Sequence, residues 1–560
     1  MRTYNKTKGM LKEELSAAHQ ADHLMWSRRH FLLTGGFAGL GTMLLNGMPV
    51  NSLFPTSLPA AFSPGNNILV LLKMFGGNDG LNMIFPHSES AGNSAYLSYR
   101  PTISHKFGTD YTDNTLLSGF GSTDFAMPSV MSSLMPLWNE GNMAILHNVG
   151  YPKQDFSHFS SIDNWASAAD NGFDPRINSG YMGRYLNQDF PAFNETPPTV
   201  PPALRIGYNA DLVFKSPDNQ QFELVFNDPN EFYRLAQYGK LYPTDDLGDC
   251  PRDEEVEFLR QLTNNSLRYS QSVTQAYNAA SSKATYPTNT VSRLADQLKI
   301  VARLIKGRLG TKVFMVYIDG FDNHANQKSA HNRLLMNIAE SVSAFFNDLK
   351  ADGFDQGVSI MTFSEFGRTI RENGSAGTDH GNMSPMMLFG PGVKGGFYGT
   401  PINLDDPGLR GGSTRVYFEQ QASIDFRTMY ASVMEQWLCM ESELVDYCLG
   451  KPYSRLPLFD NPCLGTPSGS NYHTILVGHE PNPSNDKMVD IKFTQLGSNQ
   501  VRLFIKTLDG RLLATLHDAY TTKGSYTIPF DPQKWKIHPG EYLYQLESAG
   551  KTFIRRINIF

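Results

Sequence analysis

The chain has 560 residues, of which 40% are hydrophobic and 18% are charged, and its formal net charge is −6 at pH 7. A chain of this length exceeds one ordinary hydrophobic core, so we expect roughly two to four domains. Because the net charge is small for this length, it creates no field that attracts nucleic acid, and nucleic-acid binding is disfavoured.

The N-terminal segment predicts export. Arg28 and Arg29 precede a moderately apolar run from Phe31 to Leu45 that contains several glycines, which is typical of a twin-arginine signal. About 20 apolar residues are needed to span a bilayer, so the alternative of a membrane anchor is disfavoured. We expect residues 1–61 to form the signal and leader, with the twin-arginine translocase as a partner. Many proteins on this route fold and take up a cofactor first, which makes a metal ion worth seeking.

The cysteines indicate little about function. No C-x-x-C spacing occurs among the four, so we expect no thiolate zinc site; they are Cys250, Cys439, Cys448 and Cys463. A disulfide among the last three is compatible with a compartment outside the cytoplasm. The sequence does not choose among the pairings.

Strand-length apolar runs and helical patterns alternate along the chain. Buried strands are predicted at 67–74, 312–318 and 357–363. Helices are predicted at 253–280, 291–309, 329–350 and 425–438. The order strand, loop, helix, strand is that of a parallel α/β sheet. We therefore predict an α/β domain over residues 62–465, with a mostly parallel central sheet flanked by helices.

The pattern changes near residue 465. A stretch rich in Pro, Gly, Ser and Asn precedes short segments of alternating polarity, and Asp509-Gly510 has the composition of a hairpin turn. This predicts a small all-β sandwich over residues 466–560. We assign it no chemistry, because no acidic and histidine side chains cluster in its sequence.

Polar residues follow the predicted strands where each strand ends: Asp79, Asp319, Asp322, His324 and Glu365. Open α/β sheets bind their ligands at this edge. Each residue alone has an ordinary structural explanation, such as a turn, a helix cap or an Asp-His hydrogen bond. Together with His380, however, they supply the carboxylates and imidazoles that suit zinc, manganese or another divalent ion.

Five motifs occur in an order that resembles the bacterial family called domain of unknown function 1501. They are LVLLKMFGGNDGLNMIFP, AILHNVGYPKQDFSHFSSIDNW, GYMGRYL, DGFDNHANQ and TFSEFGRTIRENGSAGTDHGNMSPMMLFGPGVKGG. The resemblance covers roughly residues 65–440. This family is placed in the alkaline phosphatase-like superfamily, with sulfatases and cofactor-independent phosphomutases. The resemblance therefore implies an alkaline phosphatase-like fold.

The resemblance also implies a set of metal ligands. Glu365 and His380 stand where the superfamily has an aspartate and a histidine ligand. The spacing from Asp319 to His324 resembles the ligands of the other metal, with Asp322 the acid more usual in the smaller family. Asp79 matches the first carboxylate ligand. One or two divalent ions are implied, whether zinc, manganese, calcium or magnesium.

Catalytic roles follow from the same resemblance. Ser157 lies where the nucleophilic hydroxyl opens a helix, with His158 beside it and Ser160 as the alternative nucleophile. Arg368 can clamp an oxygen of a phosphate or sulfate. Phe366 departs from the pattern, because it stands where a second histidine ligand is expected and cannot bind metal. One metal site is therefore weakened or absent.

The tail resembles the type A sorting domain of the type 9 secretion system, from PNPSNDKMVDIKF through GEYLYQLESAGKTFIRRINIF. This implies the type 9 machinery as a partner, and passage from the periplasm to the cell surface or the medium. The alternative is a carbohydrate-binding or spacer β domain.

The sequence thus predicts an exported, metal-dependent hydrolase of sulfate or phosphate esters, with a small-molecule or glycan ester as substrate. The alternative is a non-catalytic envelope or surface binding protein on an alkaline phosphatase-like scaffold.

Overall fold

The computed structural model describes residues 67–559, except 153, 155, 172–173, 192, 194–196, 237–239, 244–250, 289–290, 405–421, 461–473 and 481–487. The predicted signal and leader at 1–61 lie outside the described residues, as do Cys250 and Cys463. In the described part of the chain, no helix is long and apolar enough to cross a membrane.

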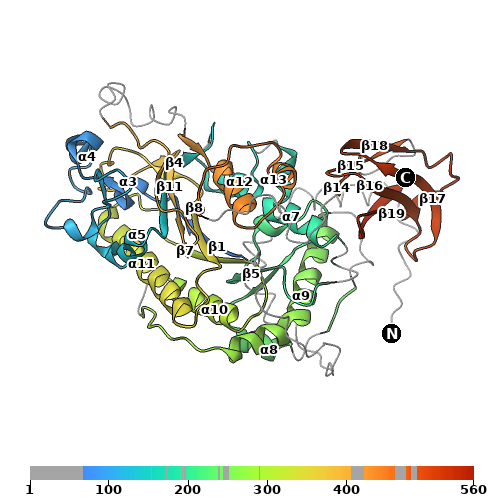
Figure 1. The fold of residues 1–560 in the computed structure, drawn as a ribbon, viewed down its shortest axis with the longest axis horizontal. Helices are drawn as coiled ribbons and strands as arrows, with labels where there is room; N and C mark the ends of the chain where they lie inside the picture. Colours follow the sequence, from blue (N-terminus) through green and yellow to red (C-terminus); the bar gives the residue numbers. More distant parts are fainter. Residues whose placement is uncertain are drawn as a thin grey trace, which may run out of the picture.

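A nine-stranded sheet occupies the centre of the α/β part (Figure 1). Its order is β12-β4-β11-β8-β1-β7-β5-β6, and β13 pairs with β4. The strands are β1 (Ile68–Phe75), β4 (Met143–Gly150), β5 (Ala203–Ile206), β6 (Glu223–Phe226), β7 (Val313–Asp319), β8 (Val358–Ser364), β11 (Ser384–Phe389), β12 (Gly396–Tyr398) and β13 (Ile424–Asp425). Only β11 runs antiparallel to its neighbours in this sheet. The predicted mostly parallel sheet is confirmed.

Helices cover both faces of the sheet, and β1 shows why. Its alternate residues point to opposite faces, so Val70 and Leu72 join one core, while Leu69 and Leu71 join the other. The first core packs under α9 (Pro251–Ala279), α10 (Leu294–Lys306) and α11 (Gln327–Ala351). The second packs under α6 (His158–Ser167), α7 (Tyr181–Asp189), α12 (Phe426–Gln436) and α13 (Ser442–Leu449). The predicted strands and helices are confirmed, with ends displaced by one to three residues.

Shorter elements complete the α/β part. The helices are α3 (Gly80–Met83), α4 (Asn93–Tyr99), α5 (Met135–Asn139) and α8 (Pro229–Ala236). Two-residue strands pair as β2 (Phe85–Pro86) with β3 (Phe125–Ala126), and as β9 (Gly367–Arg368) with β10 (His380–Gly381).

Three adjacent parallel strands end together on one side of the sheet, and we call this side, at their carboxyl ends, the functional edge. In the order β8-β1-β7, Phe75 of β1 pairs with Asp319 of β7, and Met74 pairs with Ser364 of β8. These three strands therefore end at the same level. The loops that follow them meet at this edge.

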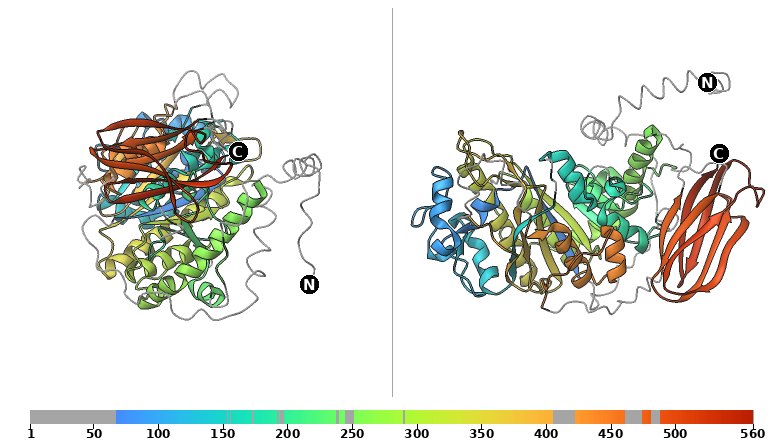
Figure 2. Two further views of the ribbon diagram at one scale, coloured as in Figure 1. Left: turned by 90° about the vertical axis from the view of Figure 1, so that its right-hand side faces the viewer. Right: turned by 90° about the horizontal axis from the view of Figure 1, so that it is seen from above.

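The C-terminal residues form two antiparallel sheets around a core of their own (Figures 1 and 2). The strands are β14 (Thr474–Glu480), β15 (Val489–Gln495), β16 (Asn499–Lys506), β17 (Leu512–Thr521), β18 (Gly524–Phe530), β19 (Gly540–Ser548) and β20 (Lys551–Ile559). One sheet has the order β14-β15-β18 and the other β17-β16-β19-β20. Gly510, with φ of +86°, sits in the turn between β16 and β17. The predicted sandwich and hairpin are confirmed.

The sandwich contacts the α/β part beside α7 and α13 (Figure 1). Arg555 Nε lies 2.6 Å from Asp218 Oδ2, and Ile475 of β14 joins the second α/β core. Nearby in the α/β part, Cys439 forms a disulfide, whereas Cys448 is a buried free thiol whose pKa burial raises to about 12.

Candidate metal centre and adjoining cleft

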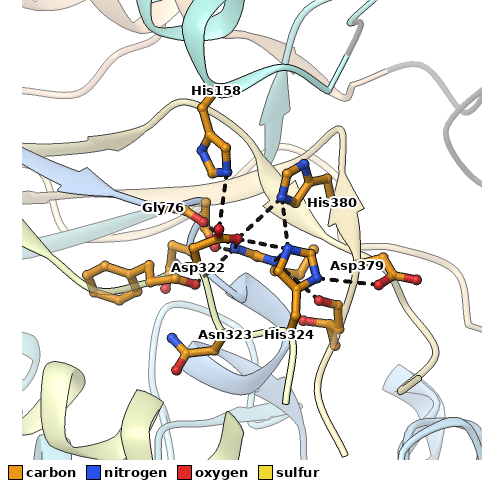
Figure 3. A network of polar contacts seen from close by, with 12 residues as sticks. Gly76, His158, Asp322, Asn323, His324, Asp379 and His380 are labelled. Carbon is orange, nitrogen blue, oxygen red and sulfur yellow. Dashed lines mark hydrogen bonds and ion pairs between the residues drawn. The ribbon is translucent and has the colours of Figure 1, made fainter. Parts of the chain in front are cut away.

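Histidine side chains gather around one aspartate at the functional edge (Figure 3). Asp322 Oδ1 lies 2.9 Å from His324 Nε2 and 3.3 Å from His380 Nε2. Its Oδ2 lies 3.5 Å from His158 Nε2. Candidate ligand atoms of His158, Asp322 and His380 all lie within 4.8 Å of one another, and His324 Nε2 is 3.1 Å from His380 Nε2. We call these four residues the histidine cluster.

Segments distant in the sequence contribute to the cluster. His158 is the first residue of α6, Asp322 and His324 lie between β7 and α11, and His380 lies in β10. The loop after β1 passes so close that a Cβ on Gly76 would stand 2.4 Å from the backbone nitrogen of Asp322. Gly76 has φ of +114°, so this close crossing of two loops requires glycine.

Each imidazole has an acceptor near its Nδ1 atom: Glu365 Oε1 at 2.8 Å for His158, the Phe156 carbonyl at 2.8 Å for His380, and Asp379 Oδ1 at 3.4 Å for His324. A neutral imidazole that donates from Nδ1 carries a lone pair on Nε2. In that tautomer, the Nε2 atoms of the three rings would direct lone pairs toward the Asp322 carboxylate. Among the described residues, the buried Nε2 of His158 has no hydrogen-bond partner. Imidazoles held this way beside a carboxylate fit a divalent ion.

The surroundings of Asp322 and His380 favour the forms in which these groups bind a metal ion. Burial alone would raise the pKa of Asp322, but the hydrogen bond and charge of Arg368 lower it below its usual value. Burial lowers the pKa of His380, which favours its neutral form. The hydrogen bond to Glu365 raises the pKa of His158. A cation between the rings would oppose that last shift, because it competes with the proton for Nε2.

Arg368, the predicted anion clamp, is buried among carbonyl groups and beside Asp322. Its side chain is 1% exposed, and its Nη2 lies 2.7 Å from Asp322 Oδ1. The other donors meet backbone carbonyls: Gly77 at 2.7 Å, Phe321 at 3.0 Å, Thr378 at 3.2 Å, and Gly76. The guanidinium thus joins three loops and holds Asp322, and its role as an anion clamp stays a prediction.

Asp79 lies outside the histidine cluster. Its Oδ2 accepts from Arg100 Nη1 at 2.7 Å and from Gln327 Nε2. Arg100 is fully buried and needs a buried counter-charge, which Asp79 provides. Asp319, the last residue of β7, is not among the ligand atoms that converge in the described part of the chain. The ligand roles of Asp79 and Asp319 therefore stay predictions.

Glu365 and Phe366 lie beside the histidine cluster. Glu365 Oε1 accepts from both His158 Nδ1 and the Gly76 backbone N–H, each at 2.8 Å, so it fixes the ring of a candidate ligand, and its own ligand role stays a prediction. The buried Phe366 ring lies 4.7 Å from the His158 ring and 4.4 Å from the His380 ring. It forms an apolar wall where the resemblance implied a second histidine.

Ser157 precedes the cluster residue His158. It is half-buried and forms the N-cap of α6, and its backbone carbonyl accepts from Ser161 N at 3.0 Å. Ser157 is thus the chain neighbour of a cluster residue, with Ser160 one turn along the helix. Its nucleophilic role stays a prediction.

A cleft of about 520 Å³ adjoins the cluster, and His158, Asp322 and Glu365 form part of its wall. The remaining wall includes the aromatic side chains Phe75, Phe159, Tyr208 and Tyr317, and the polar side chains Arg205, Asn209 and Asp319. Sequence reasoning missed Arg205 and Tyr208. Both residues lie at or just after the end of β5. This strand has only four residues, too few to be recognised from its hydrophobic pattern.

Over residues 234–404 the chain matches the family described as Protein of unknown function (DUF1501). This span carries Asp322, His324, Glu365 and His380 but not His158. No curated protein matches the chain.

Similar solved structures include Ps i-CgsB in complex with k-i-k-neocarrahexaose, with 9% identity and a TM-score of 0.28 over 85% of this chain and 88% of that chain. Another is the PsFucS1 sulfatase from Pseudoalteromonas sp., with 11% identity and a TM-score of 0.28 over 84% of each chain.

Proposed function

We propose that this protein is an exported hydrolase that uses a divalent metal ion to cleave sulfate or phosphate esters. The observation that carries the proposal is the convergence of three Nε2 atoms on the Asp322 carboxylate, at the wall of a cleft. His158, Asp322 and His380 would hold the ion, with His324 as a further donor. When bound, such an ion stabilises negative charge on an ester oxygen and activates a hydroxyl or water nucleophile.

The residues of the chain itself orient and enclose this site. Glu365 fixes the ring of His158, and Arg368 fixes the carboxylate of Asp322. The Phe366 ring excludes water from one side of the histidines, which strengthens electrostatic interactions there. Ser157 would supply the nucleophilic oxygen and pass its proton to a neighbouring base.

Metal analysis of the purified mature protein, combined with a screen of aryl sulfates and aryl phosphates, tests the proposal. We expect about one divalent ion per chain and hydrolysis of one ester class that chelation abolishes. Asp322→Asn should lose both metal and activity. Hydrolysis of neither class by metal-loaded protein would overturn the proposal and favour a non-catalytic binding protein.

Ser157→Ala distinguishes the two kinds of nucleophile. If the serine hydroxyl attacks the ester, this variant retains metal but loses hydrolysis. Full activity in Ser157→Ala would assign the attack to water or to Ser160, which Ser160→Ala then separates.

The export part of the proposal rests on Arg28, Arg29 and the C-terminal sandwich, and the Cys439 disulfide supports it, because disulfides persist in oxidising compartments. In a host with both secretion systems, Arg28→Lys with Arg29→Lys should hold the chain in the cytoplasm. Deletion of residues 474–560 should leave it in the periplasm. Surface delivery of the truncated chain would instead favour a binding or spacer role for the sandwich.

A further inference from the structure

Two exposed aromatic side chains border the cleft beside the histidine cluster. Phe159, in the first turn of α6, is 53% exposed, and Tyr208, after β5, is 52% exposed. Phe75 and Tyr317 contribute to the wall of the same cleft and pack edge to face at 6.1 Å. Exposed apolar groups that gather on a concave surface mark a site of ligand contact.

Tyr208 is held in place although its ring is exposed. Its hydroxyl accepts hydrogen bonds from Asn227 Nδ2 at 2.8 Å and from Arg293 Nη1 at 3.3 Å. A ring fixed before the ligand arrives loses little conformational entropy on binding. Tyr208 therefore has the properties of a preformed stacking surface.

The carboxylates of the cleft disfavour a ligand that carries several negative charges away from the histidine cluster. Asp319, Asp322 and Glu365 place carboxylates on the wall. Arg205 is the one guanidinium on the described wall, and it shares Asp211 Oδ2, at 3.1 Å, with Lys73, at 2.8 Å, so the carboxylates of the wall outnumber it. A ligand that extends along this wall must be uncharged over most of its length, because added negative charge would be repelled.

The wall also offers hydrogen-bonding groups between its aromatic rings. Asn209 supplies an amide and Asp319 an exposed carboxylate. Within the described part of the chain, the buried Nε of Arg205 has no hydrogen-bond partner. The cleft thus combines flat apolar surfaces with donors and acceptors at their edges.

We propose that the cleft binds a saccharide, whose C–H faces stack on Phe159 and Tyr208 and whose hydroxyl groups bond to Asn209 and Asp319. A sugar ring is neutral, rigid, apolar on its faces and polar at its edge, which matches this wall. The inference rests on the proposed function, since it makes the substrate a saccharide ester whose charged group reaches the histidine cluster.

A glycan array of neutral oligosaccharides, followed by calorimetric titration of the ligands found, tests binding without turnover. We expect the wild type to bind the same glycans before and after a chelator has removed its metal. Phe159→Ala and Tyr208→Ala should each weaken binding about tenfold, while Tyr520→Ala, which removes a 69% exposed ring on β17, should change nothing. Because the cleft rings are exposed, melting temperatures should stay the same.

Absence of glycan binding by the wild type, or binding unchanged in both cleft variants, would overturn the saccharide assignment. Adenosine monophosphate serves as an alternative ring ligand. If the protein bound adenosine monophosphate but none of the glycans, the saccharide assignment would also be overturned. Glycan binding without hydrolysis of any saccharide sulfate or phosphate would refute the proposed function alone. If the wild type hydrolyses these esters, Phe159→Ala should raise KM for a saccharide sulfate or phosphate. It should leave KM for the corresponding methyl sulfate or methyl phosphate unchanged.

Discussion

His158 Nδ1 lies 2.8 Å from Glu365 Oε1, and the same oxygen accepts the backbone N–H of Gly76 at 2.8 Å. One buried carboxylate thereby joins the start of α6, the end of β8 and the loop after β1. It also directs the Nε2 lone pair of His158 toward Asp322. The orientation of a candidate ligand thus depends on a residue that would not touch the metal.

Removal of this carboxylate should weaken metal binding. We expect Glu365→Ala to raise the metal dissociation constant about 10- to 100-fold, as is typical for the loss of an outer-shell partner. Glu365→Gln should have a smaller effect, because its amide oxygen can still accept from His158 Nδ1. Competition with a chromophoric chelator measures both. An unchanged dissociation constant in Glu365→Ala would contradict this role.

Removal of a candidate ligand should have a larger effect. His380→Ala should lower the bound metal from about one ion per chain to a small fraction of that, since tetrahedral sites need their full donor set. His538→Ala, which removes an exposed histidine of the sandwich, is the matched control and should retain its metal. Elemental analysis after dialysis reports both values. Equal metal content in the two variants would refute the assignment of His380.

Arg368→Lys tests whether the arginine joins loops or binds substrate. Lysine cannot reproduce the contacts to Gly77, Phe321 and Thr378, so buried carbonyls lose partners and the free energy of unfolding should fall by about 2–4 kcal/mol. Arg511→Lys, at an exposed hairpin position, should have no such effect. Denaturant unfolding gives the comparison. A raised KM with unchanged stability would support the anion-clamp role.

His147 should make stability depend on pH. Burial lowers its pKa from 6.5 to about 4, and its ring packs 4.7 Å from Phe125 and 5.2 Å from Phe397. Between these pH values the unfolded chain binds a proton that the folded chain does not. Protonation of the unfolded chain therefore lowers the free energy of unfolding as the pH falls from 6.5 toward 4, and has no such effect above pH 6.5.

His147→Phe should remove this contribution while keeping an aromatic ring in place. Between pH 7 and pH 4 the wild type should lose about 2–3 kcal/mol more unfolding free energy than the variant. Other buried histidines titrate in both proteins, so their effects cancel in the difference. Urea unfolding at the two pH values provides the measurement, and equal losses would contradict the prediction.

The sequence by itself determined the strands and helices around the site. The run at 67–74 is apolar except for Asn67 and Lys73 because β1 is buried on both faces, and such a run is visible without any knowledge of its neighbours. The same logic placed Asp322, His324 and Glu365 at one edge, since parallel strands end together. Local composition likewise predicted the sandwich and its hairpin.

Only the tertiary structure decided which side chains face one another. Asp79 and Asp322 both follow strands, yet Asp79 pairs with buried Arg100, whereas Asp322 meets the histidines. His158 depends on Glu365, 207 positions away, for the direction of its ring. Residue type and strand position set which loops can meet, but the contacts of a side chain depend on packing between segments that the sequence keeps far apart.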